Sequence, residues 1–321
     1  MRTYIKELRW GNFILLRGDM ISNYASNYGE WCEVEVDLYK TLLSEGSNVI
    51  EIGANIGLHT IPLSKICGKG SIICFEPQPP IFNMLCGNLA INNILNVMPY
   101  NKAVGDRCGS VVIPVSSYDK PWNYGSFSIE KGYNSEGDYD ASPAQPSPAQ
   151  PSPAQPSPAQ PSPAQPSPAQ PSPAQPSPAQ QCIDLITIDA FTESTGLKVD
   201  FIKIDVEGYE LNCIRGAVNT IKDNRPAIFC EAINKNITNE VVSFLSDLGY
   251  EGFWFIGNRY RQDNFFACPG QIYNKLSYDV NIIFIHKEDR GGSRNLCRER
   301  LKRFEYFEQL HEGITVLNSY P

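Results

Sequence analysis

Four acidic residues stand at the ends of short apolar segments that have the pattern of buried strands. They are Glu51, Glu76, Asp205 and Glu231. Because ligands of open α/β sheets bind at the carboxyl ends of the strands, we expect these side chains to line one site. Carboxylates placed there can bind ribose hydroxyls, contact a cationic group, take a proton from a substrate or hold a divalent metal.

A glycine-rich turn follows the first of these strands, in the segment Glu51-Ile-Gly53-Ala-Asn55-Ile-Gly57. Glycines at such a turn let the backbone approach a ligand, and the N-terminus of the following helix offers N–H groups. The two glycines are four residues apart, which differs from the GxGxxG of dinucleotide-binding folds. A carboxylate here suits a cationic group, such as the amino group of S-adenosylmethionine, better than a pyrophosphate. The alternative is a tight strand–helix turn without a ligand.

Glu76 lies 25 residues after Glu51, at the end of the second expected strand. An acidic residue at that position can accept both ribose hydroxyls of an adenosine cofactor. The alternative is an exposed turn residue before Pro77.

The segment Lys203-Ile-Asp205-Val-Glu207-Gly208 places two more carboxylates between a strand and a helix. Asp205 and Glu207 could orient a substrate or take its proton. Alternatively, they cap the helix and complement its dipole. His59, just after the glycine-rich turn, is either a further candidate base or a packing residue.

Strands and helices alternate along the chain, which predicts a mostly parallel sheet with helices on both faces. Two late strands have no clear helix between them and suggest an antiparallel pair at one edge. The expected strands are 48–52, 71–75, 97–101, 200–204, 226–230, 253–256 and 281–285, with further short strands at 111–115 and 183–188. The expected helices are 34–46, a second ending near 67, and three on the apolar stripes 81–89, 211–221 and 241–248, with a terminal amphipathic helix within 296–310.

Composition excludes several classes of protein. The net charge of −8 argues against a nucleic-acid binder. No run of about 18 apolar residues exists to span a membrane, and the N-terminus lacks the pattern of a signal peptide. The ten cysteines form no CxxC pair, which favours buried free thiols in a reducing, cytoplasmic compartment over disulfides or a metal site.

The segment from Ser142 to Gln180 repeats SPAQP and contains 15 of the 25 prolines. We interpret it as an expansion with extended, polyproline-II-like structure in a tolerant loop. Alternatively, its PxxP spacing makes it a weak polyproline ligand.

These motifs together resemble the FkbM-type methyltransferase family. The matching segments are Gly29–Leu38 (GEWCEVEVDL), Val49–Gly57 (VIEIGANIG), Phe75–Leu85 (FEPQPPIFNML), Asn101–Asp106 (NKAVGD), Thr187–Phe191 (TIDAF) and Phe201–Glu210 (FIKIDVEGYE), with Pro226–Glu231 (PAIFCE) compatible but less specific. The resemblance covers roughly residues 20 to 290. Its most specific parts are the GANIG turn, the FEP-type strand end and the IDVEG segment.

The resemblance implies a Rossmann-like class I methyltransferase fold of the α/β class, with a seven-stranded sheet. It also implies S-adenosylmethionine as methyl donor and O-methylation of a hydroxyl on a sugar or small metabolite. Carried over by position, the methionine part would be held by Glu51, Gly53, Asn55 and Gly57. Glu76 would bind the ribose, Asn101 and Ala103 would lie near the adenine, and Asp205 and Glu207 would face the methyl group and the acceptor. The family often has Asp where this chain has Glu51.

We therefore expect an N-terminal extension and helix over residues 1–46 and a methyltransferase domain over 47–289. A disordered repeat insert over 142–181 interrupts the domain, and a helical tail covers 290–321. The expected partner is a small-molecule or carbohydrate acceptor, with no nucleic acid, membrane or metal involved. Two alternatives remain: an NAD(P)-dependent oxidoreductase, and a non-catalytic cofactor-binding fold that displays the repeat.

Overall fold

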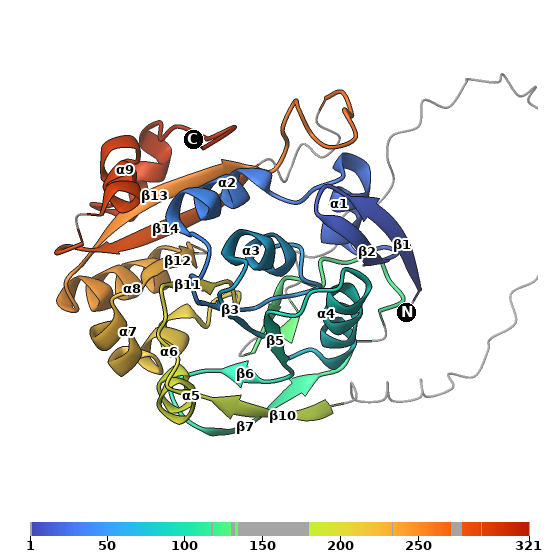
Figure 1. Cartoon of the computed structure of the whole chain (residues 1–321), viewed down its shortest axis with the longest axis horizontal. Coiled ribbons are helices and arrows are strands. Elements are labelled where there is room, and N and C mark those ends of the chain that lie inside the picture. Colours follow the sequence, from blue (N-terminus) through green and yellow to red (C-terminus); the bar gives the residue numbers. More distant parts are fainter. Residues whose placement is uncertain are drawn as a thin grey trace, which may run out of the picture.

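A computed structural model describes residues 2–116, 118–129, 132–133, 180–232, 234–270, 278–289 and 291–320. Seven strands form a central sheet with helices on both faces (Figure 1). In spatial order they are β13 (Tyr250–Asn258), β14 (Tyr278–His286), β12 (Ala227–Glu231), β11 (Phe201–Ile204), β3 (Val49–Ile52), β4 (Ile72–Phe75) and β5 (Val97–Tyr100). The predicted α/β class and seven-stranded sheet are confirmed.

The strands from β12 to β5 pair in parallel, whereas β14 runs antiparallel to both of its neighbours, β12 and β13. The expected antiparallel pair at one edge is therefore present. Because parallel strands share their direction, the acidic residues at their carboxyl ends reach the same edge of the sheet.

Alternate side chains of each strand enter two separate cores. Along β3, Ile50 and Ile52 pack with one group of helices, and Val49 packs with the other. One face carries α2 (Glu33–Leu42), α3 (Thr60–Cys67) and α4 (Pro79–Ile91). The opposite face carries α5 (Ile188–Thr195), α6 (Glu210–Arg215), α7 (Val218–Asn224) and α8 (Lys235–Asp247).

The single helix expected over residues 211–221 is divided into α6 and α7. Gly216 stands at the break, where an added Cβ would lie 1.9 Å from the carbonyl oxygen of Gly105. Gly105 directly follows β6 (Ala103–Val104). The break therefore accommodates a close approach of two backbones, which the apolar stripe alone did not reveal.

The first 30 residues form elements that the sequence did not predict. A hairpin of β1 (Thr3–Leu8) and β2 (Gly11–Leu16) leads into α1 (Met20–Tyr28) and lies beside α4 (Figure 1). The Asn88 side chain of α4 accepts from the Ile14 N–H at 2.6 Å and donates to the Ile14 carbonyl at 3.3 Å. Asn92 pairs with the backbone of Asn12 in the same way. The side-chain amides of these two asparagines thus supply β2 with the hydrogen bonds that a neighbouring strand would otherwise make. No local sequence pattern predicts this contact between α4 and β2.

A small three-stranded sheet joins the chain on either side of the repeat. It has the order β6, β10 (Gln180–Ile186) and β7 (Gly109–Pro114). A short pair, β8 (Phe127–Ser128) and β9 (Gly132–Tyr133), precedes the repeat. Gln180 and Gln181, which we assigned to the insert, pair with Pro114 and Ile113 in this sheet. The other residues of the expected insert lie outside the described residues.

The expected tail helix is shorter than its pattern suggested. Helix α9 (Gly292–Arg300) ends ten residues early, and a 3-10 helix (Phe307–Glu312) follows it. Between them, the Phe304 N–H donates to the Gly252 carbonyl and the Lys302 carbonyl accepts from Trp254, both at 2.8 Å. The tail therefore leaves the helix to cover the open edge of β13.

All ten cysteines are unpaired, and six of them are buried, as the apolar surroundings suggested. Cys108 and Cys182 are exposed. Among the residues that the structure describes, no helix combines the length and the apolar character needed to cross a lipid bilayer.

Candidate functional site

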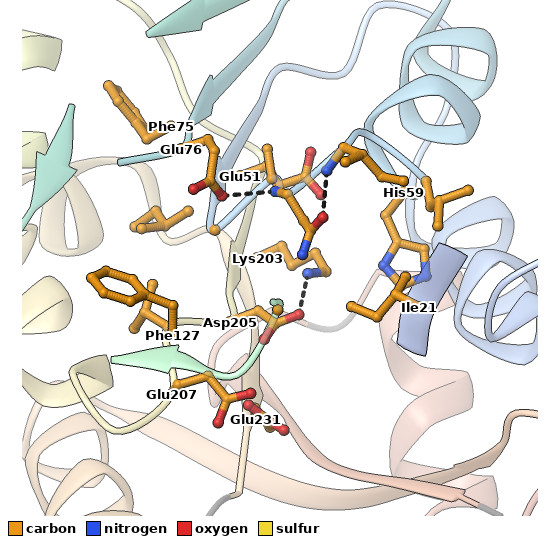
Figure 2. A pocket seen from close by; sticks show the side chains of 18 of the residues that line it. Ile21, Glu51, His59, Phe75, Glu76, Phe127, Lys203, Asp205, Glu207 and Glu231 are labelled. Carbon is orange, nitrogen blue, oxygen red and sulfur yellow. Dashed lines mark hydrogen bonds and ion pairs between the residues drawn. The ribbon is translucent and has the colours of Figure 1, made fainter. Parts of the chain in front are cut away.

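One cavity lies at the carboxyl edge of the central sheet and contains the four strand-end acids. It is lined by Glu51 from β3, Glu76 after β4, Asp205 after β11 and Glu231 from β12 (Figure 2). The empty space of the cavity is about 1110 Å³ when the solvent at its open mouth is included. The four carboxylates therefore line one cavity, as their strand-end positions suggested, and their role in binding a ligand stays a prediction.

Segments distant in sequence close the cavity. The N-terminal part of the chain contributes Ile21 and Trp31, and the strand pair at the sheet edge contributes Arg259 and Asp279. Pattern analysis did not identify these residues, because nothing local marks a loop or edge strand that folds back over a distant site.

The backbone N–H groups of the GANIG turn donate hydrogen bonds to acceptors within the protein. The N–H groups of Gly53 and Ala54 both bond to the Phe75 carbonyl, and that of Gly57 bonds to Ala54. Glu76 Oε2 accepts from the Asn55 N–H at 3.0 Å, and the Ile56 N–H donates to the Asn55 side chain at 2.7 Å. Every N–H from residue 53 to residue 57 therefore has a partner within the protein.

The two glycines of this turn are required by packing and conformation. Gly53 has φ +85°, and an added Cβ would lie 1.8 Å from the Asp205 carbonyl oxygen. At Gly57, with φ +89°, a Cβ would lie 2.8 Å from a methyl group of Leu85. Asn55 also adopts a left-handed conformation, with φ +48°. The turn thus fits closely between β11 and α4, which brings the Asp205 segment beside Glu51.

Glu51 is buried below the turn. Its Oε2 accepts a hydrogen bond of 2.6 Å from the Thr60 hydroxyl at the start of α3. Burial raises the pKa of Glu51 to about 7, although the nearby Lys203 ammonium opposes the shift. A cationic ligand group would favour the ionised carboxylate further.

Glu76 is also buried, and both of its oxygens accept backbone hydrogen bonds. One bonds to Asn55 and the other to the Gln78 N–H at 2.8 Å. Burial raises the pKa of Glu76 to about 7, against the effect of these hydrogen bonds. Each carboxylate oxygen has a second lone pair, so the group can still accept two hydroxyls.

Asn101 and Ala103 occupy different positions. Ala103 lines the cavity. The Asn101 side chain instead donates to the carbonyls of Glu76 and Pro77, at 2.8 and 3.1 Å. Asn101 therefore fixes the turn that carries Glu76, and its proximity to an adenine stays a prediction.

Lys203 is a site residue that the sequence analysis missed. Its side chain is 3% exposed, and Nζ lies 2.9 Å from Asp205 Oδ2. Burial lowers the pKa of Lys203, but Asp205, Glu51 and Glu35 outweigh this and raise it. A lysine inside the apolar strand FIKI, two residues before an acid, was the available signal.

Asp205 and Glu207 both line the cavity but differ in environment. The Asp205 side chain is 44% exposed and is held by Lys203. Glu207 has an unusual φ of +53° and faces Glu231 (Figure 2). Burial, followed by the charge of Asp205, raises the pKa of Glu207 to about 8.

Arg259, directly after β13, forms an ion pair with Asp279 of β14. Asp279 Oδ1 accepts from Arg259 Nε at 2.7 Å, and the guanidinium lies over Trp31, 5.1 Å from the ring centre. Among the described residues, Arg259 Nη1 is buried without a hydrogen-bond partner. This pair brings one arginine to a wall of the cavity that is otherwise acidic.

Cys32, Glu35 and Asp279 present atoms within 4.8 Å of one another. Such a group could hold a metal ion, but Glu35 already accepts from Cys32 Sγ at 3.3 Å and from Asn281 Nδ2 at 3.0 Å. Burial, followed by the charge of Glu35, keeps the pKa of Cys32 well above its ordinary value, so the thiol stays protonated. Metals bind the thiolate form, so hydrogen bonding accounts better for this cluster.

His59 lines the cavity beside Glu35, with Nε2 3.7 Å from Glu35 Oε2. Burial, followed by the charge of Lys203, lowers the pKa of His59 to about 3. The neutral ring packs against Tyr39, with centroids 5.6 Å apart. These contacts favour the packing interpretation over that of a base.

A family model described as "Methyltransferase FkbM domain" matches residues 51–251. The chain is 29% identical over 108 residues to the tRNA(Phe) (4-demethylwyosine(37)-C(7)) aminocarboxypropyltransferase of Methanocaldococcus jannaschii, covering 29% of this chain and 43% of that protein. It is 31% identical over 88 residues to the methyltransferase sdnD of Sordaria araneosa, covering 26% and 34%. The matches thus span less than half the length of these curated relatives.

Among solved structures, the chain is similar to a methyltransferase FkbM from Methylobacillus flagellatus KT. The two share 16% identity with a TM-score of 0.41, over 77% of this chain and 47% of that chain.

Proposed function

Because the chain belongs to the FkbM methyltransferase domain family, we propose that it transfers a methyl group from S-adenosylmethionine to a hydroxyl of a sugar or another small polar metabolite. The observation that carries this proposal is the convergence of Glu51, Glu76, Asp205 and Glu207 on one cavity. When bound, S-adenosylmethionine supplies an activated methyl group on a positively charged sulfur.

The residues present fit such a donor. Glu51 presents a carboxylate to its amino group, and Glu76 presents lone pairs to its ribose. The cavity is also lined by the apolar side chains of Ala103, Val104 and Phe127, which suit a purine base. Gly53 and Asn55 line the cavity, and the Asn55 N–H holds Glu76, whereas Gly57 belongs to the same turn but lies outside the cavity lining.

A dinucleotide cofactor fits less well. A pyrophosphate is bound by free backbone N–H groups at the first strand–helix turn. Here the N–H groups of residues 53–57 all have partners inside the protein. With Glu51 buried directly below the turn, this arrangement counts against the NAD(P)-dependent alternative.

For the acceptor, Glu207 is the better base and Asp205 the better orienting group. A carboxyl whose pKa lies near the working pH is an effective proton acceptor, and Glu207 has a pKa of about 8. Asp205 is paired with Lys203 at 2.9 Å, which fixes the position of its carboxylate. Holding the hydroxyl in line with the methyl group can lower the barrier by about 7–11 kcal/mol.

The charge of the cavity favours a neutral acceptor. Acidic side chains on its walls outnumber the basic ones, Lys102, Lys203 and Arg259. An anionic acceptor would be repelled, whereas a sugar hydroxyl can both donate to a carboxylate and accept from an arginine. The name of one relative includes tRNA(Phe), but a net charge of −8 offers a nucleic acid little attraction.

Calorimetric titration with S-adenosylmethionine, NAD and NADP tests the choice of cofactor. We expect heat with S-adenosylmethionine alone, and saturation by NAD or NADP instead would overturn the proposal. Incubation with a methyl-labelled donor and a carbohydrate and metabolite extract, followed by mass spectrometry, then identifies the acceptor. A label found on nitrogen or carbon would contradict O-methylation.

A further inference from the structure

Glu207 and Glu231 form a close pair of carboxyl groups at one end of the cavity. Figure 2 shows their oxygens pointing toward one another, one residue coming from the loop after β11 and the other from the end of β12. Glu231 Oε2 is buried, and no described residue offers it a hydrogen bond. Both residues are half-buried. Two adjacent carboxylates so placed would repel each other, and an unpaired charge at the buried Glu231 Oε2 would be costly.

The groups that face this pair do not neutralise it. Asp205 at the end of β11, Glu210 on α6 and Asp279 on β14 are all acidic, and each raises the pKa of one or both members. The positive charge of Arg259 acts on Glu207, but its guanidinium is bound to Asp279 through two of its nitrogens. The Lys203 ammonium donates to Asp205 at 2.9 Å.

We propose that Glu207 and Glu231 hold one proton between them in the free protein and release it when a cationic methyl donor enters the cavity. This inference rests on the proposed function. A shared proton supplies the missing partner of Glu231 Oε2 and removes the repulsion. Burial is the first cause of the raised pKa of both groups, and the charge of the neighbouring acids adds to it.

The release prepares the base for the reaction. Entry of the positive charge is balanced by loss of the proton, which leaves Glu207 ionised and able to act. The new O–CH3 bond forms as the S–CH3 bond breaks, and the electron pair of the broken S–CH3 bond stays on sulfur. The hydroxyl proton of the acceptor moves to Glu207. The carboxyl pair then holds one proton again, beside an uncharged thioether. Glu231 thus acts as a positioning residue that sets the charge of Glu207.

Proton release can be counted without an acceptor. Calorimetric titrations at pH 7 in buffers of different ionisation enthalpy give the number of protons released per ligand bound. S-adenosylmethionine and S-adenosylhomocysteine differ only in the methyl group and the positive charge on sulfur. Protons that Glu51 and Glu76 release on binding the parts common to both ligands therefore cancel when the two proton counts are subtracted. We expect the cationic donor to release up to about one proton more than the neutral product.

The variant Glu231→Gln should reduce this difference to less than half, because Glu207 beside a neutral amide ionises more readily. The matched control is Glu33→Gln, a buried glutamate whose pKa burial also raises but which lies outside the cavity lining. The control should keep the wild-type proton count. If Glu231→Gln does not fold, as judged by circular dichroism, Glu207→Gln removes the same pair and carries the same expectation.

Equal proton release by the two ligands in the wild type would overturn the inference and leave donor binding intact. An equal loss in the Glu33→Gln control would also overturn it, because the protons would then come from elsewhere. If S-adenosylmethionine gives no binding heat, the proposed function itself fails.

Discussion

Lys203 Nζ lies 2.9 Å from Asp205 Oδ2 in the lining of the cavity, and the lysine side chain is only 3% exposed. The same ammonium acts on the carboxyl of Glu51. One buried cation therefore links an expected donor-binding residue to an expected acceptor-facing residue. The two strands that carry them, β3 and β11, are direct neighbours in which Lys203 pairs with Glu51.

Replacing Lys203 by methionine should cost about 3–5 kcal/mol of unfolding free energy, because the neighbouring carboxylates lose their buried partner. The control is Lys69→Met. Lys69 is 86% exposed in its ion pair with Glu45, and its loss should cost at most about 1 kcal/mol. Urea unfolding measures both. Equal effects would mean that the buried pair has no special role.

Glu51→Gln should weaken S-adenosylmethionine binding by about 10- to 100-fold, since a charge-assisted hydrogen bond contributes roughly 1.5–3 kcal/mol. Calorimetry checks this value, and Glu33→Gln serves again as a control outside the cavity. Adenosine, which lacks the amino acid part, should bind both variants equally. Unchanged donor affinity in Glu51→Gln would remove Glu51 from the donor site.

Asn101→Ala should weaken binding of adenosine and lower stability by about 1–3 kcal/mol, because the carbonyls of Glu76 and Pro77 lose their donor. A Glu76→Gln variant should weaken adenosine binding without an equal loss of stability. Comparing the two variants distinguishes the effect of Asn101 on the shape of the Glu76 turn from the direct contact of Glu76 with adenosine. Full adenosine affinity in Asn101→Ala would show that the turn holds its shape alone.

The free protein should lose stability relative to a Glu207→Gln variant as pH rises from about 5 to 8. The pKa of Glu207 is raised from 4.5 to about 8 on folding, so its favourable contribution is complete below 4.5 and disappears as pH rises through 8. The slope for one group is at most about 1.4 kcal/mol per pH unit. Urea titrations at several pH values measure it. Parallel curves for the two proteins would contradict a raised pKa.

Deleting residues 142–179 should leave S-adenosylmethionine affinity unchanged. Strand β7, which comes before the repeat, and strand β10, which comes after it, pair with each other from Pro114 and Gln180 inward, so their sheet does not need the repeat for its register. Loss of donor binding would show that the repeat supports the cavity. Lost capture of a polyproline-binding domain with normal methyl transfer would support the display alternative.

The sequence by itself determined the sheet and the acids at its edge. Apolar strands alternating with amphipathic helices leave few arrangements, and parallel strands must bring Glu51, Glu76 and Asp205 to one side. The same local reasoning detected the glycine-rich turn, because a left-handed backbone at Gly53 and Gly57 favours glycine.

Only the tertiary structure decided what each acid does there. Lys203 reaches the cavity from a strand interior, Trp31 from a distant N-terminal segment and Arg259 from the end of an edge strand. Such contacts have no sequence period. Burial and neighbouring charge then give the carboxyl groups different environments. Asp205 is paired with the Lys203 ammonium, whereas Glu207 faces the carboxyl group of Glu231. Both effects depend on distances across the folded molecule, so the acidic residues of the sequence became distinct chemical groups only after folding.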